Sequence, residues 1–75
     1  LPQRHDTRDR VAHLLTIHKA LRLLYPENPE LRYDWVNRRN RAFDNLRPIE
    51  VMDEQGLAGI ARVARFLEHE CGRPV

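Results

Sequence analysis

The sequence predicts an all-α domain, and three observations support that prediction. Apolar residues recur every three or four positions in two long segments, which is the spacing of one face of an α-helix. No segment alternates apolar and polar residues with the period of a β-strand. Proline residues and Asx pairs divide the chain at three places into short connections. We therefore expect one domain over residues 1–75, a small bundle of about four helices.

The first helix is predicted to be long, running from about Asp6 to Leu24. Pro26 ends it, because the residue before a proline avoids the helical conformation. The helix has about five turns, and one side of it is apolar. That side contains Val11, Leu14, Leu15, His18, Leu21 and Leu24 or Tyr25. We expect this side, including His18, to lie in the core or in an interface.

The second and third helices are predicted to be short. Asn28 is a suitable cap for the second helix and Pro29 suits its first position. Leu31 and Trp35 lie one turn apart on the same side of this helix. A polar loop over residues 37–41 follows, because this stretch is basic and has no periodicity.

Phe43 then returns to the core before the Asp44-Asn45 pair, which favours a turn. Pro48 is expected to begin the short third helix. The fourth helix follows the cap region of residues 53–55 and is amphipathic, with an apolar side made of Leu57, Ile60, Ala61, Ala64 and Leu67. Gly72 is suited to end it.

Composition excludes several classes of protein. The 13 basic and 11 acidic residues give a formal charge of only +2, which is not the charge of a typical nucleic-acid binder. The single cysteine, Cys71, excludes an internal disulfide and a thiolate metal site. No two histidines have the spacing of a helical metal site, and no apolar run is long enough to span a membrane. We expect a cytoplasmic protein without cofactor or metal.

The sequence also argues against catalysis. Cys71 lies two positions after His69, and residues one or two positions apart in a helix do not face each other. A nucleophile needs a base within reach and a third group that orients the base. The glycines form no phosphate-binding loop. We therefore predict that the chain is not an enzyme.

One basic segment keeps an alternative open. Arginines surround Phe43 and follow Trp35, an arrangement that also occurs in proteins that bind single-stranded nucleic acid: Arg38, Arg39, Arg41 and Arg47. The competing interpretation is that the two aromatic residues are core anchors and that the arginines are solvated. Direct nucleic-acid binding is kept here as the weaker alternative.

The order of motifs resembles a known family. The chain has Arg10-Val-Ala-His-Leu-Leu through Leu-Leu-Tyr-Pro26, then Trp35-Val-Asn, then Asn40-Arg-Ala-Phe43-Asp-Asn-Leu-Arg-Pro48, and finally a helix ending in Cys-Gly-Arg. This pattern is similar to the C-terminal toxin-binding domain of Xre/MbcA/ParS-like antitoxins, from roughly Asp6 to Arg73. The motif residues, which we interpret first as fold determinants, are Trp35, Asn40, Phe43 and Pro48. Family members usually have Gly in the turn where this chain has Asp44-Asn45, and Asn is a common substitute at positive φ.

The resemblance implies a type II antitoxin domain that binds and neutralises a RES-type toxin, an enzyme that consumes NAD. It also implies that the C-terminal end enters the toxin cleft, through Glu70, Gly72, Arg73, Pro74 and Val75. Relatives usually carry a helix-turn-helix domain before this one, so we expect the chain to be the C-terminal part of a longer antitoxin that contacts DNA only through that absent domain. The alternative is a self-association module of a transcriptional regulator, and in either case we expect a homo-oligomer.

Overall fold

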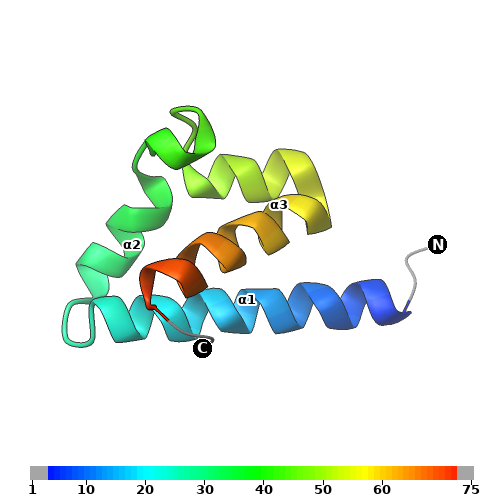
Figure 1. The fold of residues 1–75 in the computed structure, drawn as a ribbon, viewed down its shortest axis with the longest axis horizontal. Helices are drawn as coiled ribbons and strands as arrows, with labels where there is room; N and C mark the ends of the chain where they lie inside the picture. Colours follow the sequence, from blue (N-terminus) through cyan, green and yellow to red (C-terminus); the bar gives the residue numbers. More distant parts are fainter. Residues whose placement is uncertain (1–3, 73–75) are drawn as a thin grey trace.

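The computed structural model describes residues 4–72, and these residues form three α-helices and one turn of 3-10 helix (Figure 1). The elements are α1 (Arg4–Leu24), α2 (Pro29–Asn37), the 3-10 turn η1 (Arg41–Phe43) and α3 (Pro48–Glu70). The only β-type pairing within this range is an isolated bridge between Asn40 and Leu46. The all-α prediction is confirmed, with three helices in place of about four.

The helix count differs because the predicted third and fourth helices are joined in α3. Gly56 has φ 61° and ψ −137° in the middle of α3, so the helix turns sharply there. Figure 1 shows the two parts of α3 running in opposite directions from this bend. A Cβ atom at Gly59 would overlap with the backbone carbonyl of Val51, so the bend brings the two parts very close together. The sequence therefore predicted a boundary near this point, but no connection longer than a kink is present.

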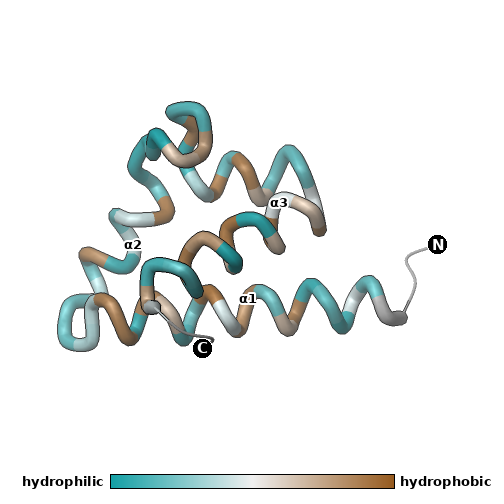
Figure 2. Tube along the Cα trace, viewed as in Figure 1, coloured by the Kyte–Doolittle hydropathy of each residue, from teal (hydrophilic) through white to brown (hydrophobic). Residues whose placement is uncertain are grey.

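The core lies between α1 and α3 and is closed by η1. Its members are apolar and almost completely buried: Ile17, Ala20, Leu21, Phe43, Val51, Ile60, Val63, Ala64 and Leu67. The second part of α3 runs along α1 in the same direction, and the Cys71 thiol donates a hydrogen bond of 3.7 Å to the carbonyl of Ala20. Apolar and polar residues alternate along both helices, as expected when one side of each faces a core (Figure 2).

The side of α1 that was expected to lie in the core or in an interface is outside the core in its first half. Val11, Leu14 and Leu15 are 61%, 47% and 49% exposed, and His18 is exposed as well. The buried side of α1 is centred on Ile17, and Val11 lies about 120° around the helix from it. Because α3 covers the Ile17 side, Val11, Leu14 and Leu15 remain about half or more exposed in the described part of the chain.

The turn before α3 is built from residues that tolerate unusual backbone angles. Asn40 caps η1, and its side-chain oxygen accepts a hydrogen bond of 2.9 Å from the backbone N–H of Ala42. Asp44 and Asn45 both have positive φ, 57° and 65°, which Asx residues adopt more readily than most. The expectation that this pair can replace a glycine turn is confirmed. The turn delivers Phe43 into the core, where only 1% of it is exposed.

Candidate functional site

Two features of the surface are candidates for function, and both lie at the same end of the molecule. The first is the C-terminal end of α3. The N–H of Gly72 bonds to the carbonyl of His69 at 3.0 Å, and Gly72 has φ 77°. A Cβ atom would meet nothing within 4 Å at this position, so glycine is favoured here by its backbone angle and not by lack of space.

Two of the predicted site residues, Glu70 and Gly72, are exposed at this end. The thiol contact with Ala20 attaches the end of α3 to α1. The other three predicted residues, Arg73, Pro74 and Val75, lie outside the described residues.

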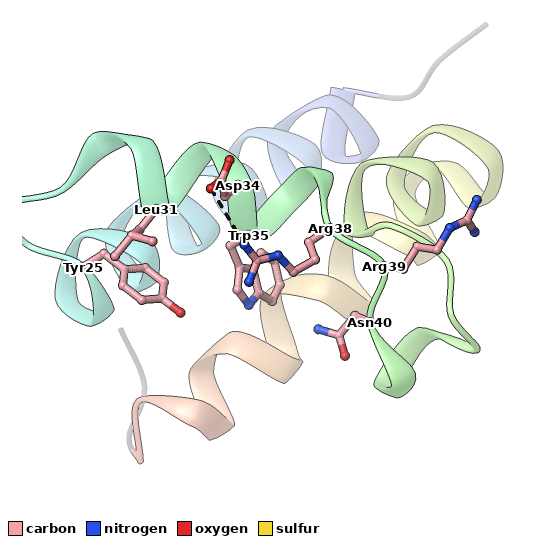
Figure 3. A pocket seen from close by; sticks show the side chains of 7 residues that line it. All are labelled: Tyr25, Leu31, Asp34, Trp35, Arg38, Arg39 and Asn40. Carbon is pink, nitrogen blue, oxygen red and sulfur yellow. Dashed lines mark ion pairs between the residues drawn. The ribbon is translucent and has the colours of Figure 1, made fainter.

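The second feature is a small recess between the end of α1, α2 and the connection to η1 (Figure 3). Its volume is about 80 Å³, and its lining is part aromatic and part charged: Tyr25, Leu31, Asp34, Trp35, Arg38, Arg39 and Asn40. We call this feature the Trp35 recess. It joins residues from three separate segments of the chain.

Hydrogen bonds in the α1–α2 connection set the position of the recess walls. The Arg32 guanidinium of α2 donates to the carbonyls of Tyr25 at 2.8 Å and Pro26 at 3.3 Å, which otherwise lack helical partners at the end of α1. The Asn28 side chain accepts from the N–H of Leu31 at 3.2 Å and caps α2. These bonds fix the direction in which α2 leaves α1.

Aromatic contacts hold Trp35 in place at the recess. Trp35 is half-buried and stacks on Phe66 of α3, with ring centroids 6.2 Å apart and an interplanar angle of 25°. It also meets Phe43 edge to face at 6.5 Å. Phe43 and Phe66 are 5.2 Å apart, so the three rings form one cluster. The buried Phe43 ring and the half-buried Phe66 ring pack against Trp35, which also lines the recess.

The polar groups at the recess are mainly hydrogen-bond donors. Figure 3 shows the Tyr25 hydroxyl and the Asn40 side-chain amide pointing toward Trp35. Within residues 4–72, the Tyr25 hydroxyl, the Trp35 indole N–H and the Asn40 Nδ2 group have no hydrogen-bond partner. Arg38 adds a positive charge and pairs only loosely with Asp34, at 3.8 Å.

The two neighbouring arginines of the recess behave differently. The Arg38 guanidinium lies in front of Trp35, whereas that of Arg39 points away from the recess (Figure 3). Arg39 donates a hydrogen bond of 3.1 Å to the carbonyl of Asn45. Farther along the basic segment, Arg47 forms an ion pair of 2.7 Å with Glu50. The arginines therefore do not form a single basic surface.

Comparison with known proteins decides the family. The profile of the antitoxin Xre/MbcA/ParS C-terminal toxin-binding domain matches residues 20–71, more than half of the 75 residues. The chain belongs to this antitoxin family. The match is narrower than the range expected from the sequence motifs, since it leaves out most of α1.

A curated relative extends the similarity over α1. The chain is 36% identical over 67 residues, 89% of its length, to the uncharacterized protein y4oB of Sinorhizobium fredii (strain NBRC 101917 / NGR234). The aligned part is 51% of that relative, so the chain spans about half the length of the curated protein it matches. No solved structure matches this chain.

The family motif residues divide into two groups in this antitoxin domain. Phe43 and Pro48 are fully buried, in agreement with a role in the fold. Trp35 and Asn40 are only half-buried, and both line the recess. Trp35 packs on the second part of α3 through Phe66, but its outer edge remains open.

Sequence reasoning missed Phe66, which supports the recess from α3. It lies three positions after the buried Val63, and this helical spacing was a signal that it packs on the inner side of α3. In the part of the chain that is described, no group of three His, Cys, Asp or Glu side chains is placed to hold a metal ion. None of the described helices is long and apolar enough to cross a membrane.

Proposed function

We propose that this domain binds and neutralises a RES-type toxin that consumes NAD. Membership of the family of antitoxin toxin-binding domains supports a toxin as the partner. The choice of a RES-type toxin rests on the resemblance of the motif order to antitoxins of that kind. Neutralisation by binding needs no catalytic group in the antitoxin.

The observation that carries the proposal is the exposed end of α3. Glu70 and Gly72 are exposed there, and the Cys71 thiol holds this end against α1. The chain continues from this point into residues 73–75, which we propose enter the toxin cleft and block access to substrate. A helix end that is held against the domain suits contact with a cleft, because its position is already set before binding.

The test is co-expression with the product of the neighbouring gene, using the full chain and a chain that lacks residues 73–75. We expect a stable complex with the full chain and a partner that lowers cellular NAD only when it is free. We expect the shortened chain to lose inhibition. Absence of any complex with the full chain contradicts the proposal, and full inhibition by the shortened chain contradicts the role of the C-terminal end.

A control uses a charge next to the bend of α3, away from the C-terminal end of the helix. Glu54 is exposed near the bend at Gly56, so Glu54→Gln changes charge without touching the proposed contact. We expect this variant to bind and inhibit as the parent chain does. Loss of inhibition in both variants would indicate a general effect on the domain.

A second candidate function is self-association within a transcriptional regulator, and the exposed side of α1 supports it. Val11, Leu14 and Leu15 are adjacent on this helix and about half or more exposed. Burial against a second copy would remove this apolar area from water, and a two-fold symmetric pair of helices is the simplest such arrangement.

This candidate is tested with the double substitution of Leu14 and Leu15 by Gln. We expect a dimer in the parent chain and a monomer in the variant, measured as molar mass by light scattering after gel filtration. A chain without residues 73–75 should remain dimeric, so the two functions are separable. A monomeric parent chain across the micromolar range rejects the candidate.

A further inference from the structure

We propose that the Trp35 recess binds a carboxylate side chain, an Asp or Glu, of the protein that this domain recognises. The proposal follows from the chemistry of the recess. Its unpartnered uncharged groups can each donate a hydrogen bond, namely the Tyr25 hydroxyl, the Trp35 indole N–H and the Asn40 Nδ2 group. The guanidinium of Arg38 adds a positive charge beside them. Several donors and the Arg38 cation around a small space fit an anionic acceptor.

The size of the recess limits the ligand to one small group. Its volume is about 80 Å³, whereas sites for cofactors and other small molecules usually have about 300–1,000 Å³. A nucleotide or a dinucleotide therefore does not fit. A carboxylate on a short side chain does fit, and the faces of Tyr25 and Trp35 are suited to contact its methylene groups.

Arg38 is free to take part because its present ion pair is weak. The side chains of Arg38 and Asp34 are 74% and 55% exposed, and their charged atoms are 3.8 Å apart. Exposed pairs of this kind contribute little to stability. A partner carboxylate that enters the recess can therefore replace Asp34 as the acceptor for Arg38 at little cost. Asp34 remains nearby and opposes any anion, and a doubly charged phosphate more than a carboxylate.

The position of the recess indicates which partner supplies the carboxylate. Trp35 stacks on Phe66, and Phe66 lies about one turn before Glu70 at the end of α3. The recess and the proposed toxin-contact end are therefore neighbours on one end of the molecule, as Figure 1 shows for α2 and the end of α3. A protein that contacts the end of α3 can also reach the recess. This assignment of the partner rests on the proposed function, whereas the chemistry of the recess does not.

The recess contains its own reporter, because Trp35 is the only tryptophan in the chain. The probe is N-acetyl-glutamate amide, with the uncharged N-acetyl-glutamine amide as the matched control, both added to the full chain at constant ionic strength. The readouts are Trp35 fluorescence and the NMR signal of the indole N–H. We expect a saturable change with the glutamate probe, with Kd on the order of 1–10 mM for such a small ligand, and none with the glutamine probe. Equal responses to both probes, or no saturation, overturn the proposal.

Three substitutions give the test a pattern that only an anion site would produce. Arg38→Gln should weaken glutamate binding by about tenfold, since a charge-assisted hydrogen bond is lost. Arg39→Gln removes the same charge from a guanidinium that points away, so it should leave binding nearly unchanged. Asp34→Asn should strengthen binding, because it removes the opposing carboxylate. Equal weakening by both arginine variants would mean general attraction of anions, and it would reject the site.

Two further measurements separate this proposal from its alternatives and from the proposed function. Inorganic phosphate that binds more tightly than the glutamate probe would overturn the carboxylate assignment in favour of a nucleic-acid backbone. In the complex with the neighbouring gene product, Arg38→Gln should raise the Kd by about tenfold and Arg39→Gln should not. A chain that binds the glutamate probe but forms no complex refutes the proposed function and leaves the recess chemistry supported. A complex that is indifferent to Arg38→Gln refutes the recess as a toxin contact.

Discussion

Phe43 and Trp35 belong to the same aromatic cluster, yet the regions around them differ. The Phe43 side is closed, since the ring is 1% exposed and the guanidinium of Arg62 lies 5.2 Å from its centroid. Arg62 also bonds to the carbonyl of Ala42 at 3.3 Å, which holds the turn over the core. The Trp35 side is open, because the ring is covered only on its inner side and its edge lines the recess.

This difference separates stability from recognition within one cluster. Changes of side-chain volume on the closed side should lower the stability of the domain and should not act on partner binding directly. On the open side, changes of side-chain shape should have little effect on stability, whereas loss of a hydrogen-bond donor should weaken binding of the partner. Four substitutions test this contrast.

Phe43→Ala should have the largest effect, because it empties a fully buried site. We expect the free energy of unfolding to fall by about 3–5 kcal/mol, which is a large part of the stability of a domain of this size. The measurement is urea unfolding followed by circular dichroism. Tyr33→Ala is the control, since Tyr33 is exposed, and it should change stability by less than about 0.5 kcal/mol. A loss below 1 kcal/mol at Phe43 would show that the site is not closed.

Gly59→Ala should disturb the closed side without removing an aromatic ring. The added Cβ atom would overlap with the Val51 carbonyl, so the two parts of α3 have to move apart. We expect a loss of about 1–3 kcal/mol, typical of overpacking, measured by thermal unfolding. Ala58→Ser, at an exposed neighbouring position, should cost about 0.5 kcal/mol or less. Equal melting temperatures for the two variants would contradict the close contact at the bend.

Trp35→Phe should weaken binding while leaving most of the stability in place. The replacement keeps an aromatic ring on Phe66, so the loss of stability should stay below about 1.5 kcal/mol. It removes the indole N–H, so affinity for the toxin partner should fall by about three- to tenfold. Calorimetric titration measures the affinity, and Tyr33→Phe is the control. Unfolding of the variant would show that Trp35, like Phe43, is needed mainly for the stability of the fold.

The smallest effect is expected at the start of α3, next to the closed turn. The Arg47 guanidinium donates a hydrogen bond of 2.7 Å to Glu50 and holds the pKa of that carboxyl below its usual value of 4.5. A lowered folded-state pKa gives stability that is present above pH 4.5 and is lost as the pH falls through the folded-state pKa. The side chains are partly exposed, so the contribution is small.

Glu50→Gln removes this dependence. Urea midpoints of the parent chain should fall toward those of Glu50→Gln as the pH drops below 4.5, and the two chains should differ most above it. Glu54→Gln, at an exposed position of the same helix, is the control and should follow the parent chain. A constant difference between the parent and Glu50→Gln at all pH values would contradict the role of the ion pair.

Local sequence was sufficient wherever backbone preference decides the outcome. The cap at Asn28 with Pro29, the start of α3 at Pro48 and the turn at Asp44-Asn45 all occur where predicted. These features depend on fixed φ angles and on side chains that bond to their own backbone, which only a few residues determine. The motif order also identified the family correctly.

Burial could not be predicted in the same way, because it depends on which side of each helix meets another. Helical spacing placed Leu14 and Leu15 on the predicted apolar side of α1. Only the reversal of α3 at Gly56 decided that the Ile17 side of α1 is the one that is covered. The number of separate helices was settled by the same bend.

The composition, the all-α class, the caps and the membership of an antitoxin family were determined by the sequence itself. The Trp35 recess was decided only by tertiary structure, because Tyr25 and Trp35 come together through the angle between α1 and α2, which is fixed by bonds from Arg32 to the end of α1. Spacing along a chain specifies which side of one helix is apolar. It does not specify how two helices cross, because that angle depends on contacts between residues distant in sequence.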